Sequence, residues 1–188
     1  MQRVARYDDE LWELVPEDPG PPPEHIAAFV RELAPADHAL DFGVGDGRVA
    51  ALIKASRLVG ADVSQVALDR ARTRLPAAEL VLVQPDEPLP FVDNAFDLVT
   101  AIETLEHVRD VQLALSEIRR VLRPGGRLAL TTPASARWRV LFRGIEHPFS
   151  PHIRAFTRRS LRTTLETMGF QVLELDASHG TLFALAVR

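Results

Sequence analysis

Three glycines at alternate positions carry the clearest chemical signal in the sequence. Gly43, Gly45 and Gly47 follow Asp41 at the end of a short apolar run, and another apolar stretch begins directly after them. Glycine permits positive φ angles, and its lack of a Cβ lets a ligand contact the main chain. We therefore expect a buried strand, a tight turn that holds a ligand, and a helix over 46–56. The G-x-G-x-G spacing differs from the G-x-G-x-x-G of dinucleotide-binding folds.

A second group of residues able to do chemistry follows an expected strand over 96–102. Glu103, Glu106 and His107 stand at positions i, i+3 and i+4, which share one face of a helical turn. Histidine titrates near neutral pH, so His107 is a candidate general base with Glu106 beside it. The alternative interpretation is that these side chains are hydrogen-bonded groups in a pocket wall.

The elements that must position these residues alternate between strand and helix. Such alternation predicts a mostly parallel sheet with helices on both faces. The last two strands are too closely connected for a crossover helix, so they must form an antiparallel hairpin near His179 and Gly180. The expected helices cover 24–33, 46–56, 65–75, 111–122 and 157–168, and the expected strands cover 40–43, 58–63, 80–84, 96–102, 127–132, 171–175 and 182–187.

These motifs resemble those of the class I S-adenosylmethionine-dependent methyltransferases, in particular the small enzymes of the ubiquinone and menaquinone biosynthesis type. The first family motif is a hydrophobic-Asp-x-Gly-x-Gly-x-Gly string, which the chain matches from Ala39. Further matches follow in the family's order at 89–91, 96–99 and 123–127, so the resemblance spans about 39–187. It implies an α/β, Rossmann-like, doubly wound seven-stranded sheet with a C-terminal antiparallel hairpin, and S-adenosylmethionine as the cofactor.

The resemblance also implies which residues contact the cofactor. Asp62, at the end of the second strand, would accept the ribose hydroxyls, although a helix-capping role is an alternative that Ser64 fits better. The family's usual adenine-binding Asp falls on Pro85 here, so Asp86 is assigned in its place. The full set comprises the glycine-loop residues and the ends of three following strands: Asp41, Gly43, Gly45, Gly47, Asp62, Val63, Asp86 and Ile102.

Two branches of the family carry a Glu-x-x-Glu-His stretch as ligands for a divalent metal, joined by a later histidine. They are the ubiquinone-pathway O-methyltransferases and the enzymes that methylate the terminal 2′-hydroxyl of small RNAs. The resemblance therefore implies a Mg²⁺ or Mn²⁺ site at Glu103, Glu106, His107 and His152. A role for His107 as a general base without metal is the alternative.

The composition and the N-terminal segment bear on the class of function, the localisation and the domain organisation. The net charge of −4 gives no nucleic-acid signature, and the absence of cysteine excludes a thiol nucleophile. Neither a signal-like stretch nor a membrane-spanning run occurs, so a cytoplasmic protein is expected. The proline-rich linker 16–23 separates a tail, 1–15, from the methyltransferase domain, 24–188. The apolar residues of that tail have helical spacing and would form either a lid over the site or plain structural cover.

We expect a methyltransferase acting on a small molecule, at oxygen. The arginines between 137 and 162 either form a solvated helix face or bind an anionic or carrier-bound substrate. The alternatives are a metal-dependent RNA 2′-O-methyltransferase, which the acidic charge disfavours, and a non-catalytic S-adenosylmethionine-binding domain. The sequence does not identify the methyl acceptor.

Overall fold

The computed structural model describes residues 2–134 and 154–188, and side-chain placement from residue 8 onward. A seven-stranded sheet has the order β3-β2-β1-β4-β5-β7-β6. Strands β1 to β5 run parallel, whereas β7 is antiparallel to both of its neighbours, β5 and β6. The strands are β1 (Ala36–Phe42), β2 (Ala55–Asp62), β3 (Glu79–Leu82), β4 (Phe96–Ile102), β5 (Leu122–Pro133), β6 (Gln171–Ser178) and β7 (Thr181–Val187). The predicted parallel sheet with a C-terminal hairpin is confirmed.

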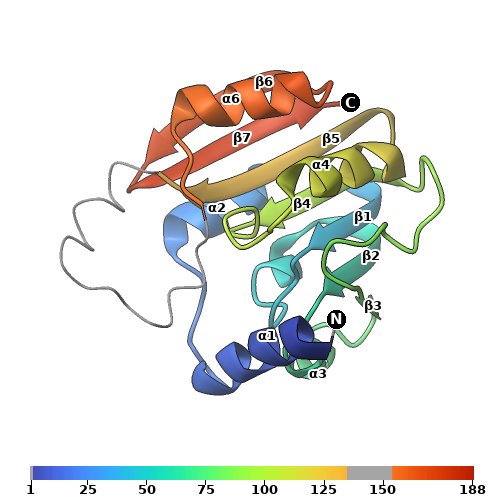
Figure 1. Cartoon of the computed structure of the whole chain (residues 1–188), viewed down its shortest axis with the longest axis vertical. Helices are drawn as coiled ribbons and strands as arrows, with labels where there is room; N and C mark the ends of the chain where they lie inside the picture. Colours follow the sequence, from blue (N-terminus) through green and yellow to red (C-terminus); the bar gives the residue numbers. More distant parts are fainter. Residues whose placement is uncertain (1, 135–153) are drawn as a thin grey trace.

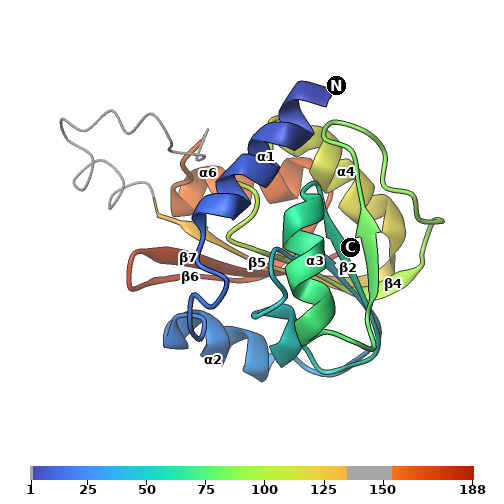
Figure 2. The ribbon, with the colours of Figure 1, turned by 90° about the horizontal axis from the view of Figure 1, so that it is seen from below.

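Helices cover both faces of this sheet. Figure 2 shows α2 on one side and α4 and α6 on the other. Leu115, Ile118 and Leu161 of α4 and α6 are fully buried in one apolar cluster, whereas Ile26 and Val30 of α2 belong to the cluster on the opposite face. The helices are α1 (Gln2–Leu14), α2 (Glu24–Glu32), α3 (Gln65–Arg74), α4 (Val111–Val121) and α6 (Arg158–Thr167), with a 3₁₀ turn, η1, at Ala50–Leu52. Burial of each such aliphatic side chain stabilises the fold by about 1.5–3 kcal/mol.

The predicted helix over 46–56 is wrong. Only the 3₁₀ turn η1 forms there, and β2 already begins at Ala55. The reason is pairing with β1, because Ala55 aligns with Ala36 and the Ala36 N–H donates to the Lys54 carbonyl. That register takes the last residues of the expected helix into the sheet. The apolar residues of the segment still pack inward, as Val49 and Ile53 contact the cluster beneath α2.

The helices that follow the site loops begin at well-formed N-caps. Ser64 Oγ accepts the Ala67 N–H at the start of α3, and Asp110 accepts the Leu113 N–H at the start of α4. Such caps satisfy backbone donors that the first helical turn leaves free. They fix the point at which each strand-to-helix loop ends. The loop before α3 carries Val63, and the loop before α4 carries Glu103, Glu106 and His107, all of which the sequence predicted to be functional.

The N-terminal tail forms helix α1, which lies beside α3 at one end of the molecule (Figure 1). Asp9 accepts hydrogen bonds from Ser64 Oγ and the Val66 N–H, so it adds to the cap of α3. Arg70 of α3 donates to the Val15 carbonyl and lies 5.9 Å from the Trp12 ring centroid. These contacts hold α1 against the methyltransferase-like body. Across the described residues, we find no helix of the length and apolar character that crossing a membrane requires.

Candidate functional site

A cavity of about 450 Å³ opens at the carboxyl ends of β1, β2 and β4, beneath α1. Open α/β sheets place their ligands at this edge. The walls come from the glycine loop, the ends of β2 and β4, the loop after β3, and α1 itself. The residues that line it and that the sequence singled out are Gly43, Gly45, Asp62, Val63, Asp86, Glu103 and His107.

Two of the three motif glycines face this cavity. Gly43 and Gly45 have φ angles of 82° and 54°, a region that side chains other than glycine adopt only with strain. A Cβ on Gly43 would collide with Thr104, and one on Gly45 would lie 2.8 Å from the Trp12 ring. Gly47 serves packing instead, because a Cβ there would meet Leu75 at 2.8 Å.

Asp62 joins the glycine loop to the end of β2. Its Oδ2 accepts the Gly45 N–H at 2.8 Å, and its Oδ1 accepts the Ser64 N–H at 3.0 Å. The residue is only 8% exposed, and burial raises the carboxyl pKa while these hydrogen bonds lower it. Each carboxylate oxygen retains capacity for a further donor. Asp62 can therefore hold the loop and still accept hydroxyl groups from a ligand in the cavity.

Two other predicted cofactor contacts lie behind the cavity wall. Asp41 is 2% exposed, and its Oδ1 accepts a hydrogen bond from Thr100 Oγ1 at 2.5 Å. Burial raises the pKa of Asp41 to about 7. Ile102 is also buried, and its carbonyl accepts the Thr104 hydroxyl at 3.0 Å. Like Gly47, neither residue is among those that line the cavity.

The loop after β3 contributes Asp86, which is exposed and has a φ angle of 58°. Pro85, the position where the family usually carries its adenine-binding acid, lines the cavity beside it. The left-handed conformation of Asp86 turns the chain at this point. Aspartate tolerates that region better than most residues. The carboxylate thus lies at the mouth of the cavity.

Two carboxyl groups with unsatisfied oxygens mark the end of β4. Glu103 has a φ angle of 51°, and Glu106 is 1% exposed with its Oε2 accepting the Thr132 hydroxyl at 3.1 Å. The Oε1 atoms of both glutamates are buried and have no hydrogen-bond partner among the described residues. Burial, and secondarily the charge of Glu103, raise the pKa of Glu106 to about 8; burial also raises the pKa of Glu103. Strain and unpaired buried oxygens concentrate at functional sites.

His107 follows directly and is exposed to the cavity, with its Nε2 4.0 Å from Glu106 Oε1. Residues 103–107 form a turn and no helix, so the expected shared helical face does not exist. Within the described ranges, no three acidic or histidine side chains are grouped to hold a metal ion. His152 lies outside those ranges. The described residues alone therefore do not complete the metal site that the sequence suggested.

Among the lining residues, sequence reasoning expected Trp12 only as part of a lid or of structural cover, and it did not single out Asp8 on α1 or Arg109 after β4. Burial and the charge of Asp62 raise the pKa of Asp8 to about 6, and Arg109 opposes that shift. The spacing of Asp8 and Trp12 at i and i+4 places them on one face of α1, and this was the available signal. The spacing did not predict where on the domain α1 packs.

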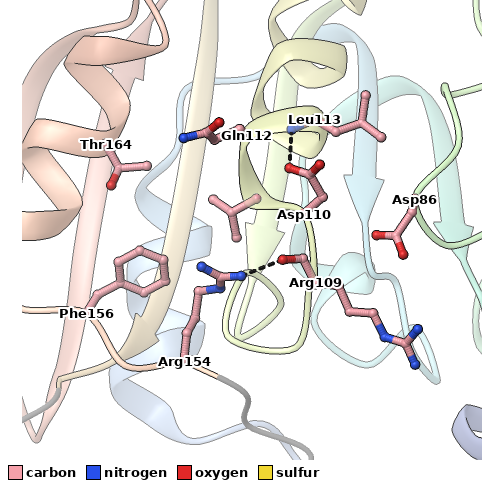
Figure 3. Close-up of a pocket in the computed structure, with 9 residues that line it drawn as sticks. Asp86, Arg109, Asp110, Gln112, Leu113, Arg154, Phe156 and Thr164 are labelled. Atoms are coloured by element: carbon pink, nitrogen blue, oxygen red, sulfur yellow. Dashed lines mark hydrogen bonds between the residues drawn. The ribbon is translucent and has the colours of Figure 1, made fainter.

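A second cavity of about 550 Å³ adjoins the first and shares lining residues with it. Arg154 donates to the main-chain carbonyls of Val108 and Arg109, which fixes one wall of this groove (Figure 3). Phe156 lies on the same side as Arg154, whereas Arg109 and Asp86 point from the opposite side. The two cavities therefore adjoin at a common wall, formed by Asp86, Arg109, Asp110 and Leu113.

The sheet order and the cavity at its strand ends define a Rossmann-like α/β protein with a site for an extended small ligand. A family profile described as "Methyltransferase domain" matches residues 40–130. A malonyl-[acyl-carrier protein] O-methyltransferase of Methylococcus capsulatus is 34% identical over 165 residues, which cover 82% of this chain and 59% of the relative. An O-methyltransferase of Pyrenophora dematioidea is 31% identical, with 84% of this chain and 67% of the relative covered.

Among solved structures, an S-adenosylmethionine-dependent methyltransferase from Mesorhizobium loti superimposes with a TM-score of 0.68 at 18% identity, covering 88% of this chain and 96% of that one. This likeness concerns the fold. Together with the sequence relatives it shows that the chain belongs to the S-adenosylmethionine-dependent methyltransferases, a family of enzymes. The chain spans less than two thirds of the length of the Methylococcus relative.

Proposed function

We propose that this protein transfers a methyl group from S-adenosylmethionine to the oxygen of a small molecule. The observation that carries the proposal is the continuous cavity from Asp62 and the glycine loop to His107. It has the size and mixed lining of a small-molecule site. The two O-methyltransferase relatives support the choice of oxygen as the acceptor atom.

The residues around the cavity fit S-adenosylmethionine. Gly43 and Gly45 line the cavity with main chain alone, and the remaining lone pairs of Asp62 suit the two hydroxyls of a ribose. Asp86 and the loop around it would face the base, and Glu103 and Thr104 would lie near the methionine end. When bound, the cofactor supplies an electrophilic methyl group and becomes a neutral thioether. The acceptor oxygen must lose its proton in the same reaction.

His107 is the base that the geometry favours for this proton. It reaches the cavity, whereas Glu106 is buried behind it and holds its own proton up to a pH of about 8. Glu106 Oε1 lies 4.0 Å from the His107 Nε2, so the carboxyl is the neighbouring group that can influence the charge of the imidazole. A divalent metal held by Glu103, Glu106, His107 and His152 is the alternative means of acidifying the acceptor. The described residues give it two carboxylates but no complete ligand set.

The adjoining groove is where we place the rest of the acceptor. Arg109 and Arg154 supply positive charge beside an apolar wall at Phe156, which suits an anionic or carrier-bound acceptor. Asp86 and Asp110 in the same groove limit how much negative charge it accepts. The Methylococcus relative, whose name specifies a carrier-bound acceptor, supports this choice.

We also propose that α1 is a lid over the cofactor site and that residues 24–188 form the methyltransferase domain. Trp12 covers Gly45, and Asp8 faces Asp62 across the cavity. Two hydrogen bonds hold helix α1 against α3: Asp9 of α1 accepts from Ser64, and Arg70 of α3 donates to the carbonyl of Val15, just after α1. Such contacts can break without disturbing the sheet. Opening of α1 would admit the cofactor to a cavity that is otherwise covered.

Calorimetric titration with S-adenosylhomocysteine tests the proposal directly. We expect micromolar binding that Asp62→Ala abolishes, while Asp69→Ala, an exposed change on α3, leaves it intact. No binding by the wild-type protein would overturn the proposal. Transfer of labelled methyl should then be measured with hydroxylated acceptors bearing a carboxylate, a phosphate or a carrier arm. Methylation of RNA alone would refute the small-molecule acceptor, and loss of activity on chelation that manganese restores would favour the metal over His107.

A further inference from the structure

The loop between β3 and β4, residues 83–95, builds one wall of the cavity without a strand or helix of its own. Its shape must come from contacts elsewhere, because a loop lacks the repeating hydrogen bonds that fix regular elements. Leu89, at the centre of the loop, is buried and lines the cavity. Two side chains of α4, Glu117 and Arg120, hold it. They are absent from the residues that the sequence suggested.

Both main-chain groups of Leu89 are bound by this pair. Glu117 Oε2 accepts the Leu89 N–H at 2.8 Å, and Arg120 Nη2 donates to the Leu89 carbonyl at 2.9 Å. The two side chains also bind each other through Oε1 and Oε2 at 2.9 Å and 2.7 Å. The result is a closed ring of hydrogen bonds joining the loop to the helix.

Arg120 is saturated by these contacts. Besides Leu89 and Glu117, its Nη1 donates to the Phe91 carbonyl and to Asp93 Oδ1, each at 2.8 Å. An arginine carries five N–H donors, and this guanidinium makes five hydrogen bonds. Lysine has the same charge but lacks the planar fork, so it cannot reproduce the arrangement. The loop conformation therefore depends on the planar geometry of the guanidinium as well as on its charge.

The electrostatics agree with the geometry. The hydrogen bonds from Arg120 are the largest influence on Glu117 and lower its carboxyl pKa, while the hydrogen bond to Glu117 raises the pKa of Arg120. The pair therefore remains ionised throughout the neutral range. Charged hydrogen bonds of this kind are stronger than neutral ones. We call this pair of side chains, Glu117 and Arg120, the clamp. It keeps both charges across the neutral range and holds the wall at each of these pH values.

We propose that Glu117 and Arg120 are positioning residues that set the cofactor specificity of the cavity, by fixing the wall that faces the base. The inference rests on the proposed function. The wall held by the clamp includes Asp86, whose carboxylate can accept hydrogen bonds from the amino group of a base, and it continues through Gln84 and Pro85. A wall displaced by a fraction of an ångström would lose this selection for an amino-bearing base before it lost general affinity.

The experiment compares Arg120→Lys with Arg119→Lys, the same change one position away. Arg119 donates to the Gly169 carbonyl at 3.3 Å, on the side of α4 that faces the turn after α6. Each protein is titrated calorimetrically with S-adenosylhomocysteine and with S-inosylhomocysteine, which carries a carbonyl in place of the amino group. Glu117→Gln is the second variant, because it keeps the side-chain shape and removes the charge. Melting temperatures establish that every variant is folded.

For Arg120→Lys we expect affinity for S-adenosylhomocysteine to fall about tenfold, and the preference over S-inosylhomocysteine to shrink toward one. Arg119→Lys should match the wild type in both. Equal loss of affinity for the two ligands would reduce the clamp to a structural support and overturn the inference, as would a wild type that binds both equally well. A wild type that binds neither would instead refute the proposed function.

Discussion

Replacing Asp41 with asparagine should make the protein more stable at neutral and alkaline pH. The carboxyl is buried behind the glycine loop, and burial raises its pKa from 3.8 to about 7, with the Thr100 hydrogen bond opposing that shift. The folded protein therefore binds this proton more tightly than the unfolded chain does. Stability contributed by the protonated group is lost as the pH rises from about 4 toward about 7.

The difference of about three pKa units corresponds to at most about 4 kcal/mol at pH 8, at 1.36 kcal/mol per unit. Asparagine is neutral at every pH, and its side-chain oxygen can still accept the Thr100 hydroxyl that lies 2.5 Å from Asp41 Oδ1. The folding free energy of the variant therefore does not include the cost of burying a charged side chain at position 41. At pH 4 both proteins are neutral there, so their stabilities should converge.

Urea unfolding of wild type and Asp41→Asn between pH 4 and pH 8.5 measures this directly. We expect the difference in unfolding free energy to grow with pH and to level off above about pH 7. Asp37→Asn, an exposed change in the same strand, provides the control. A pH-independent difference, or a variant less stable at pH 8, would refute the reasoning. Loss of S-adenosylhomocysteine affinity at unchanged stability would place Asp41 in contact with the ligand.

Four further changes follow from the same geometry. Gly45→Ala should destabilise the protein by about 1–3 kcal/mol and weaken S-adenosylhomocysteine binding in calorimetry, because the new Cβ meets Trp12 at a positive φ. Trp12→Ala should speed release of the same ligand in stopped-flow measurements, because α1 then covers the loop less completely. Glu106→Gln should raise the melting temperature at pH 9 but not at pH 4, because a carboxyl whose pKa is raised to about 8 destabilises the fold only when ionised. His107→Ala should lower the rate of methyl transfer by about 10²–10⁴-fold while leaving ligand affinity unchanged.

Sequence patterns predicted the fold where local and long-range preferences agree. The strand over 96–102 has the predicted bounds, and the last two strands pair as the short connection required. The helix over 46–56 failed because the competing interaction lies far away in the sequence. The apolar spacing of Val49 and Ile53 is compatible with a helix, but pairing of Ala55 with Ala36 in the sheet decides the outcome. No local pattern encodes that register.

The site shows a similar division. Gly43 and Gly45 of the glycine motif lie on the cavity wall, as does Asp62 at the end of β2. Asp41 and Gly47 belong to the same motif but face inward, since one accepts the Thr100 hydroxyl and the other packs against Leu75. A sequence motif predicts that its residues form one local structure. It does not distinguish the residues that contact a ligand from those that support the loop. That separation depends on side-chain direction, which only the folded chain fixes.

The residues that sequence reasoning missed share a physical feature. Asp8 and Arg120 act on the cavity from elements whose docking position is set by tertiary contacts, α1 on α3 and α4 on the loop after β3. Each is an ordinary charged residue on a helix in the sequence, where the default interpretation is a solvated face. Burial changes that interpretation, since a buried charge must find partners. Arg120, which is partly buried, makes five hydrogen bonds to four residues, whereas Asp8 lies near Asp62 with its pKa raised. Arg120, whose donors are all used, is therefore suited to shape the site, and Asp8, whose pKa is raised, is suited to respond to what enters it.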